Sequence, residues 1–461
     1  MRFVNQSVAV LGLGLETLDF LRWLDGLKTT CSVTVFDRQT EVELAPLIKQ
    51  LPADLAVKTF FGPDYLAAGL NEFQIIVRSP GFYRLHPVLL AAQKHRVKIT
   101  SPTKLFFEFC PAKIIGVTGT KGKGTTASLI AAILRASGIN VFLAGNIGKP
   151  MLKLLSVLKP KDWVCLELSS FQLQDLTVSP HISVVLNITS EHLDVHRHTR
   201  EYRLAKTNLV RWQSKADFAV LNSDYQFSRS LAHSTKAQIY WFSRYQRVTG
   251  SYVYQRRLYL KTMGQPLLVG SVDKLLLRGE HNWENVTAAI VAGRLARASI
   301  VGIKKAVFEF KGLEHRLELV KEVNQVKFYN DSFSTIPETA IAALQSFHEP
   351  IVIILGGSDK GSDYSHLGAT LHSCHRLAGV ILIGQMAGKI KASIAAAGRL
   401  QAPVIEGLTD MKSIVSAAVK LAPPVSAVVL SPACASFDMF INYKDRGDQF
   451  KYAVNQLQTQ N

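Results

Sequence analysis

The chain has 461 residues, about three times the usual length of a domain, so two to four domains are expected and a small disulfide-stapled scaffold is excluded. Hydrophobic residues make up 48% of the sequence and charged residues 19%, a composition that excludes disorder as the main state. The 53 lysines and arginines against 35 acidic residues give a net charge of +18, which is compatible with nucleic acid, an anionic membrane surface or polyanionic small ligands as partners.

Three features narrow the choice of partner and compartment. No apolar run is long enough to span a bilayer, and the first residues lead into a glycine-rich strand and turn, so we expect no membrane span and a cytoplasmic location. Residues 197–261 hold thirteen Lys or Arg and three Asp or Glu, but no RNA-binding signature with interleaved aromatics stands out there, and we do not expect nucleic acid as the partner. The five cysteines form no CxxC pair and are predicted to be inert thiols.

Short β-branched runs alternate with helix-length segments three times along the chain, which is typical of parallel sheets covered by helices on both faces. The expected strands are 7–11, 33–36, 75–77, then 114–117, 163–166, 181–186, and finally 351–355, 380–383 and 427–430. We therefore predict three α/β domains, which span residues 1–110, 111–310 and 311–461.

The first glycine-rich turn, Gly12-Leu13-Gly14-Leu15-Glu16-Thr17, follows the first expected strand. Its GxG pattern suits a nucleotide pyrophosphate, and Asp37 at the end of the second strand is placed to meet a ribose hydroxyl. Thr17 stands where the dinucleotide pattern has its third glycine, so a packing turn without a ligand remains the alternative.

A second glycine-rich turn joins the strand that ends at Val117 to a helical run that begins near Ala127. Such a turn lets backbone N–H groups converge on phosphate oxygens while Lys123 supplies a positive charge. The sequence therefore predicts a binding site for a nucleoside triphosphate. Gly124 follows the lysine where a hydroxyl is usual, so Thr125 or Thr126 must supply the magnesium-binding hydroxyl; an ordinary strand-to-helix connection is the alternative. The residues predicted to cradle the phosphates are Gly119, Thr120, Lys121, Gly122, Lys123, Gly124 and Thr125.

Two further side chains follow neighbouring strands of the central sheet. Glu167 ends one apolar strand and His192 lies just past the next, so both are expected at the carboxyl edge, where parallel sheets bind ligands. A carboxylate, an imidazole, the hydroxyl of Thr125 and phosphate oxygens form a suitable magnesium shell. A solvated strand end for Glu167 and an ordinary loop residue for His192 are the alternatives.

Nine motifs resemble those of the Mur ligases, in family order along nearly the whole chain. They are GTKGKGTT at 119–126, GNIG at 145–148, ELSSFQL at 167–173, NITSEHLD at 187–194, EYRLAK at 201–206, GEHNWEN at 279–285, EHRLE at 314–318, NDS at 330–332 and SPACASFDMFINYKDRG at 431–447. The last motif is most similar to the members that add glutamate.

The resemblance implies a fold and a reaction. The fold has an N-terminal Rossmann-like domain for the UDP of a nucleotide sugar, a central P-loop ATPase domain, and a C-terminal Rossmann-like domain that brings the amino acid and closes on ATP. The reaction is ATP-dependent addition of glutamate, with D-glutamate favoured, to UDP-N-acetylmuramoyl-L-alanine through an acyl phosphate. It uses two magnesium ions, belongs to peptidoglycan precursor synthesis, and is expected of a monomeric enzyme.

The same resemblance implies roles for single residues. The UDP sugar is assigned to Leu15, Asp37, Ser79, Asn146, Ser169 and Gln172. ATP is assigned, beyond the phosphate loop, to Asn282, Asn285, Arg316 and Asp331. Glutamate is assigned to Thr335, Lys360, Ser436, Phe437 and Tyr443.

Two basic residues complete the implied catalytic set with Lys123, Glu167 and His192. Lys206 matches a lysine that is carbamylated in the family and then holds magnesium together with Glu167 and His192; the residues alone would make it a solvated lysine in a basic stretch. Arg446 matches an invariant arginine of the family pattern.

One departure from the pattern leaves alternatives open. Phe333 stands where the family commonly has a lysine near the phosphate and amino-acid sites, so ligation of L-glutamate is the first alternative. A folylpolyglutamate-synthase-like ligase is the second, although the N-terminal unit has no place there. A nucleotide-regulated nucleic-acid-binding protein is the third, and it predicts affinity for nucleic acid that falls steeply with salt.

Overall fold

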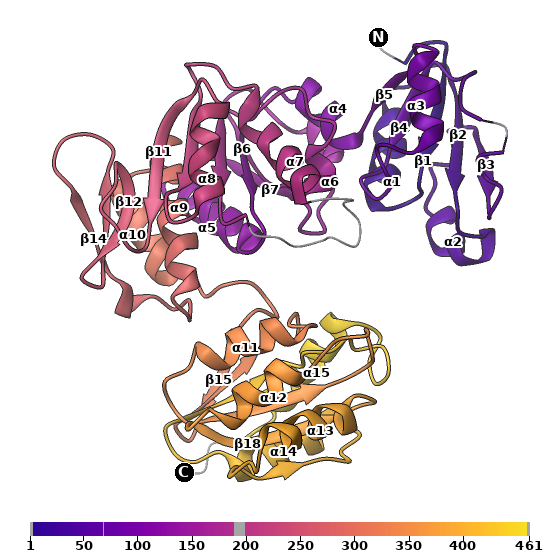
Figure 1. The fold of residues 1–461 in the computed structure, drawn as a ribbon. Helices are drawn as coiled ribbons and strands as arrows, with labels where there is room; N and C mark the ends of the chain where they lie inside the picture. Colours follow the sequence, from indigo (N-terminus) through magenta and orange to yellow (C-terminus); the bar gives the residue numbers. More distant parts are fainter. Residues whose placement is uncertain (1–2, 68, 189–198, 459–461) are drawn as a thin grey trace. The chain divides into compact units, whose positions relative to one another are not determined.

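The computed structural model describes residues 3–67, 69–188 and 199–458, which divide into two compact units. Unit 1 comprises Met1–Asp273 and Glu284–Val307, and unit 2 comprises Lys274–Trp283 and Phe308–Asn461. Unit 1 contains two sheets and unit 2 contains one, as Figure 1 shows. The prediction of three α/β parts with mainly parallel sheets is confirmed, and each sheet falls inside one of the three predicted ranges.

The N-terminal sheet is fully parallel, with the strand order β3-β2-β1-β4-β5. Its central strand is buried from Val8 to Leu11, because helices cover both faces of a parallel sheet. The strands are β1 (Gln6–Leu11), β2 (Cys31–Asp37), β3 (Val57–Phe61), β4 (Ile75–Arg78) and β5 (Lys98–Thr100). The helices are α1 (Leu15–Gly26), α2 (Glu41–Ile48), α3 (Pro87–Lys94) and α4 (Pro102–Phe109).

The central sheet has nine strands in the order β14-β13-β12-β11-β10-β9-β6-β8-β7. The strands are β6 (Lys113–Thr118), β7 (Val141–Gly145), β8 (Trp163–Glu167), β9 (Ile182–Val185), β10 (Phe218–Asn222), β11 (Gln238–Ser243), β12 (Gly250–Tyr254), β13 (Arg257–Lys261) and β14 (Leu267–Ser271). The helical elements are α5 (Lys123–Ala136), η1 (Leu152–Ser156), α6 (Ser170–Leu173), α7 (Thr199–Arg211), α8 (Gln226–Ser230), η2 (Leu231–Ser234), η3 (Val272–Lys274), α9 (His281–Leu295) and α10 (Ile300–Glu309).

The antiparallel strands β12, β13 and β14 at one edge of this sheet were not predicted. The turn from β12 to β13 is formed by Gln255 and Arg256, which both have positive φ, at 46° and 57°. In a sequence, a two-residue hairpin turn of this kind is normally indicated by Asn-Gly or Asp-Gly. Without that signal, the basic stretch gave no sequence evidence of a hairpin.

The C-terminal sheet has the order β15-β16-β20-β17-β18-β19, and only β15 runs antiparallel to its neighbour. All six residues of β17 are buried. Its side chains alternate between the two faces of the sheet, so Ile353 packs in the hydrophobic cluster on one face and Ile354 in the cluster on the other. The strands are β15 (Glu318–Val323), β16 (Val326–Asn330), β17 (Ile351–Gly356), β18 (Leu377–Ile383), β19 (Val404–Ile405) and β20 (Ser426–Leu430). The helices are α11 (Pro337–Gln345), α12 (Ser365–His372), α13 (Ala387–Ala397), α14 (Met411–Leu421) and α15 (Tyr443–Asn455).

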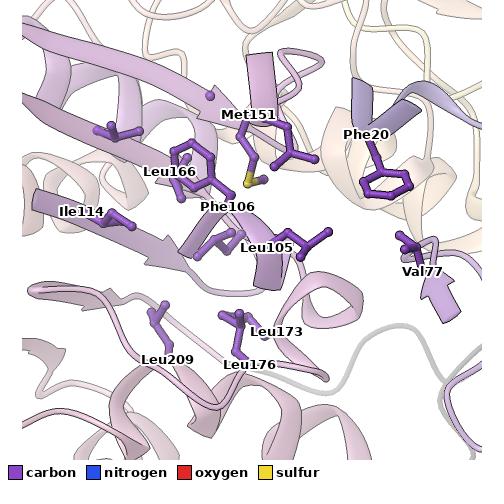
Figure 2. Close-up of a cluster of buried hydrophobic side chains, with 14 of the residues drawn as sticks. Phe20, Val77, Leu105, Phe106, Ile114, Met151, Leu166, Leu173, Leu176 and Leu209 are labelled. Carbon is purple, nitrogen blue, oxygen red and sulfur yellow. The ribbon is translucent and has the colours of Figure 1, made fainter. Parts of the chain in front are cut away.

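The two sheets of unit 1 share one hydrophobic core. Figure 2 shows this cluster, with Phe20 of α1 and Val77 of β4 from the N-terminal part, and Ile114 of β6 and Leu166 of β8 from the central part. Leu105 and its neighbour on α4 belong to the same cluster, so the helix that leads from one sheet to the next is also part of their common packing. Within the described residues, no helix is long and apolar enough to cross a membrane.

A buried ion pair also links the N-terminal and central parts of unit 1. Arg78 at the end of β4 is fully buried and binds Asp175, which follows α6, with Nε 2.9 Å and Nη2 2.5 Å from Oδ2. Its remaining N–H groups donate to backbone carbonyls, including that of Phe171 at 3.1 Å. Arg84 lies 3.3 Å from the other oxygen of Asp175 but is 43% exposed. Every polar group of Arg78 is therefore compensated inside the protein.

Replacing Arg78 with Met should lower the free energy of unfolding by about 3–5 kcal/mol, because it leaves the Asp175 carboxylate buried without its main partner. Urea unfolding of wild type and variant measures the difference. Arg84→Met removes the exposed partner of the same carboxylate and should cost less than about 1 kcal/mol. Equal losses in the two variants would contradict the assignment of Arg78 as the dominant tie.

Candidate active site

The loop between β6 and α5 depends on a left-handed residue. Gly122, the N-cap of α5, has φ of 83°, and a Cβ there would lie 2.1 Å from Oδ1 of Asn285. Lys123 begins the helix, and its Nζ donates to the carbonyl oxygens of Gly119 at 3.2 Å and Thr120 at 3.0 Å. The loop thus has the compact, glycine-dependent form of a phosphate-binding turn, with the predicted lysine at the N-terminus of a 14-residue helix.

Helix α9 carries the two predicted asparagines, and Asn285 contacts the start of α5. Asn285 accepts a hydrogen bond from the hydroxyl of Thr126 at 3.2 Å. Asn282, one turn earlier on the same helix, donates from Nδ2 to the carbonyl of Arg278 at 2.6 Å. Both asparagines are largely buried, so α9 carries them on one helix as their spacing predicted.

Lys206 lies directly beside this loop. It is 1% exposed, and its Nζ donates to the carbonyl of Gly119 at 2.9 Å and to Oγ1 of Thr118 at 3.2 Å. The ring of Tyr202, one turn earlier on α7, lies 4.7 Å from the same nitrogen. A solvated lysine, the interpretation from the residues alone, is therefore wrong, because α7 turns this side chain into the core. The carbonyl of Gly119 accepts hydrogen bonds from both Lys206 and Lys123.

The candidate metal-binding carboxylate ends the strand next to β6. Glu167 is buried, and its Oε1 accepts a hydrogen bond from the side chain of Asn146 at 3.2 Å. Gly145, with φ of 102°, brings β7 so close that a Cβ would lie 2.2 Å from the carbonyl of Glu167. This close approach places the predicted muramoyl-site residue Asn146 at the predicted magnesium ligand.

The predicted metal site includes oxygen donors of the kind that magnesium prefers. Within the described ranges there is no group of three His, Cys, Asp or Glu side chains able to hold an ion. The predicted protein ligands are Glu167, the hydroxyl of Thr125, His192 and carbamylated Lys206, and magnesium is usually bound by few protein oxygens together with phosphate oxygens and water. The predicted ligand His192 lies outside the described residues.

The short helix α6 carries the two other predicted sugar-site residues of the central part. Ser169 and Gln172 form a reciprocal capping box, with Ser169 N 2.9 Å from Oε1 of Gln172. Gln172 also donates from Nε2 to Oε1 of Glu16 at 2.7 Å, which links α6 to the first turn of α1. Burial raises the pKa of Glu16 to about 7 despite this hydrogen bond.

The first glycine-rich turn is held by the predicted ribose ligand itself. Asp37 accepts from the backbone N–H of Leu13 at 2.7 Å and from that of Gln39 at 2.9 Å. Thr17, the residue in place of the third glycine, donates its hydroxyl to the carbonyl of Gly12 at 2.8 Å. Ser79 packs so closely that a Cβ on Gly12 would lie 2.5 Å from its Oγ. The turn is thus preformed, and exposed Leu15 and half-buried Ser79 border it. The UDP assignment stays a prediction.

In unit 2, Asp331 is buried and fully engaged. Its Oδ1 accepts from the backbone N–H of Leu317 at 3.0 Å, and its Oδ2 accepts from the hydroxyls of Ser334 at 2.5 Å and Ser431 at 2.7 Å. Burial raises its pKa to about 6, although all three hydrogen bonds act in the opposite direction. The carboxylate therefore holds the turn that carries Arg316, and its contact with ATP stays a prediction.

Arg446 has a similar internal role. It is fully buried at the start of α15, and it donates to Oγ and to the carbonyl of Ser332, both at 2.9 Å. It also donates to the carbonyls of Cys434 at 3.2 Å and Ala435 at 3.1 Å. Arg446 therefore ties the segment after β16 to the segment after β20. The described structure gives it a positioning role, and direct contact with substrate stays a prediction.

The predicted glutamate residues lie on the loops that Arg446 joins and on neighbouring ones. Ser436 is buried, whereas Phe437 is exposed and its backbone N–H donates to Oγ of Ser358 at 3.2 Å. Lys360 is exposed, and Thr335 and Tyr443 are half-buried. The loops after β16, β17 and β20 thus present the other four residues at the carboxyl ends of three adjacent strands, and Tyr443 is the first residue of α15.

Sequence reasoning missed the residues that support these sites. Glu16, Arg78 and Tyr202 were inside or next to recognised motifs, but none was assigned a role. No local sequence pattern distinguishes a buried arginine or glutamate from a solvated one. The available signal was the position of these three residues beside predicted ligands. Their partners Gln172 and Asp175 are more than 90 residues away.

Comparison with known proteins decides the family. The family model described as the Mur ligase middle domain matches residues 117–293, the Mur ligase glutamate ligase domain matches 315–434, and the Mur ligase MurD-like N-terminal domain matches 6–101. The chain belongs to the Mur ligase family.

Two relatives named UDP-N-acetylmuramoylalanine--D-glutamate ligase resemble this Mur ligase over its whole length. The one from Acetivibrio thermocellus is 37% identical over 459 residues, covering 98% of this chain and 97% of the relative. The one from Symbiobacterium thermophilum is 37% identical over 457 residues, covering 98% and 99%.

Solved structures share the fold at low identity. The UDP-N-acetylmuramate-alanine ligase MurC of Thermotoga maritima has a TM-score of 0.58 at 16% identity and covers 98% of this chain and 99% of its own. A MurF structure from Acinetobacter baumannii has a TM-score of 0.59 at 18% identity, with coverages of 98% and 93%. At these identities the likeness supports the three-domain α/β fold and nothing finer.

Replacing Gly122 with Ala should weaken ATP binding at least tenfold, because the new Cβ must displace Asn285 from Thr126 in addition to adopting a left-handed conformation. Gly138→Ala is the matched control, since Gly138 has φ of 74° but open space around its Cβ position. Equilibrium binding of a nucleotide to the three proteins measures the effect. Unchanged affinity in Gly122→Ala would contradict the dependence of the loop on this glycine.

Asp331→Asn should flatten part of the pH dependence of stability. The folded pKa of about 6 exceeds the unfolded value of 3.8, so the contribution of Asp331 is fully present below about pH 3.8 and is lost as the pH rises through 6. Relative to wild type, the free energy of unfolding of the variant should therefore rise by roughly 2–3 kcal/mol between pH 4 and pH 7. Urea unfolding at several pH values tests this, and a constant difference across the range would refute it.

Proposed function

We propose that this Mur ligase joins D-glutamate to UDP-N-acetylmuramoyl-L-alanine at the expense of ATP, as a monomeric cytoplasmic enzyme of peptidoglycan precursor synthesis. The observation that carries the proposal is the convergence of Lys123 and buried Lys206 on the Gly119 carbonyl, one strand away from the Glu167 carboxylate. The names of the 37% identical relatives support the choice of substrates.

In the first proposed step, the alanine carboxylate attacks the γ-phosphate of ATP in line and an acyl phosphate forms while ADP leaves. Lys123 would release its two loop carbonyls and donate to the transferring phosphoryl oxygens. Thr125, Glu167 and His192 would hold magnesium, which supplies neutralisation of the phosphate charge. Asn146, Ser169 and Gln172 would orient the acid, because they border the same carboxyl edge of β7 and β8.

In the second proposed step, the glutamate amine attacks the acyl carbon, a tetrahedral intermediate collapses, and inorganic phosphate leaves. Lys360 would pair with a carboxylate of the incoming amino acid, and the hydroxyls of Thr335 and Ser436 would donate to its oxygens. Phe437 and Tyr443 would shape the apolar wall of the glutamate site. Asn282, Asn285, Arg316 and Asp331 complete the proposed ATP contacts.

Lys206 is proposed to work as a carbamate. Its ammonium now donates to Gly119 and Thr118. Loss of a proton would give the neutral amine, which would add to carbon dioxide with release of a second proton, so a carbamate anion would replace the cation at the same place. That change would give magnesium a second protein carboxylate group beside Glu167. A second magnesium ion is proposed on this ground.

The alternatives differ in what supports them. The MurD-like match of residues 6–101 and the full-length relatives argue against a folylpolyglutamate-synthase-like ligase. Ligation of L-glutamate retains one specific observation in its favour, the aromatic Phe333 in place of the usual lysine. The nucleic-acid-binding alternative rests on the net charge of +18.

Lys123→Ala should lower the rate of amide formation by about 10²–10³-fold, on the scale of a removed transition-state donor. Wild type and variant are incubated with ATP, magnesium, UDP-N-acetylmuramoyl-L-alanine and either enantiomer of glutamate, and product and phosphate are quantified. Lys113→Ala, an exposed lysine at the start of β6, should retain wild-type activity.

The same assay separates the alternatives. Product with D-glutamate only supports the proposal, and product with L-glutamate only replaces the acceptor. Phosphate release that needs no glutamate, or an undiminished rate in Lys123→Ala, would overturn the proposed function.

A further inference from the structure

The residue that breaks the family pattern lies against a predicted ATP ligand. The guanidinium carbon of Arg316 lies 3.9 Å from the centroid of the Phe333 ring. The Phe333 ring also contacts the ring of Tyr443, with the two ring centroids 5.1 Å apart and the ring planes at 90°. Phe333 thus lies between an arginine and a tyrosine that the proposed function assigns to ATP and to glutamate.

The turn that carries Arg316 is strained on both sides. His315 has φ of 62° and Leu317 has φ of 45°, conformations that side chains other than glycine rarely adopt. Such conformations persist where surrounding contacts impose them, and they cluster at functional sites. The backbone around Arg316 is therefore held in a form that the sequence would not choose locally.

The contacts that impose this form come from the Phe333 segment and its neighbours. The N–H of Leu317 donates to Asp331 at 3.0 Å, and the N–H of Phe333 donates to the carbonyl of His315 at 3.0 Å. The N–H of His315 donates to Glu318 at 2.9 Å. The chain thus fixes the backbone on each side of Arg316, and the ring of Phe333 packs against the Arg316 guanidinium.

Exposure argues against a purely structural reason for this aromatic residue. Phe333 is 40% exposed, and it belongs to none of the buried clusters of unit 2. A large apolar side chain at such a place gains little from burial, whereas its ring face attracts a cation. A lysine at this position would instead repel Arg316.

We propose that Phe333 is a positioning residue, whose ring holds the Arg316 guanidinium in the orientation that meets the nucleotide. The site then has one fixed cation, Arg316, whereas the family pattern has a lysine at the position of Phe333 as well. This inference rests on the proposed function, because it takes the ATP role of Arg316 from it.

The test is a double-mutant cycle on ATP binding and turnover. Phe333→Leu should raise the KM for ATP and the dissociation constant of the nucleotide about tenfold, with less than about a threefold change in the KM for glutamate. Phe333→Tyr keeps the ring face and should stay within about twofold of wild type. In an Arg316→Met background, Phe333→Leu should have no further effect on either ATP parameter.

Several results would overturn the positioning role. They are additive effects of Phe333→Leu and Arg316→Met, an unchanged nucleotide affinity in Phe333→Leu, or a loss in Phe333→Tyr equal to that in Phe333→Leu. Ile441→Ala, which removes an exposed apolar side chain of the same unit, controls for general surface effects and should match wild type. Direct nucleotide binding keeps the two proposals apart: wild type that binds ATP but forms no amide contradicts the proposed function alone.

Discussion

The left-handed conformation of Gly122 is the constraint on which the candidate active site depends. It lets the chain leave β6, turn within a few residues, and start α5 with Lys123, while Asn285, which is bonded to Thr126, occupies the space that a side chain would need. The same compact turn points the Gly119 carbonyl at two lysines. If this backbone opened, the lysine hydrogen bonds to Gly119 and the contact of Asn285 with Thr126 would be lost together.

Electrostatics explains why so buried a place is useful for phosphate chemistry. Lys123 and buried Lys206 donate to one carbonyl, so two ammonium groups lie near each other in the structure. Like charges at such a place repel each other, and the proposed carbamylation of Lys206 would relieve that repulsion and leave Lys123 as the cation that meets the triphosphate. Preorganised charges of this kind need no reorganisation during the reaction, which is the main service a protein gives phosphoryl transfer.

Most of the fold and the glycine-rich loop before α5 could be predicted from the sequence, because both have local sequence patterns. Buried parallel strands read as continuous apolar runs, as in β17, and a glycine-rich turn between such a strand and a helix is visible without tertiary information. The β12–β13 hairpin left no such signal, because Gln255 and Arg256 form its turn. Family resemblance, not local pattern, identified Lys206.

Long-range compensation could not be predicted. Whether Arg78 or Arg446 is buried depends on carbonyls and carboxylates distant in the chain, which no spacing rule supplies. The same holds for Asp37 and Asp331, which were predicted as ligands and are engaged by backbone N–H groups in the structure. In each case the structure supplies the long-range partner that fixes the side chain, and the ligand roles of Asp37 and Asp331 stay predictions.

The central claim is that the bound acid is activated as an acyl phosphate beside Lys123. Its most direct measurement uses UDP-N-acetylmuramoyl-L-alanine labelled with ¹⁸O in the alanine carboxylate, with mass spectrometry of the inorganic phosphate released during one turnover. The account predicts that one ¹⁸O atom of the carboxylate appears in each phosphate. Phosphate that carries oxygen only from ATP and water, together with amide product, would contradict it.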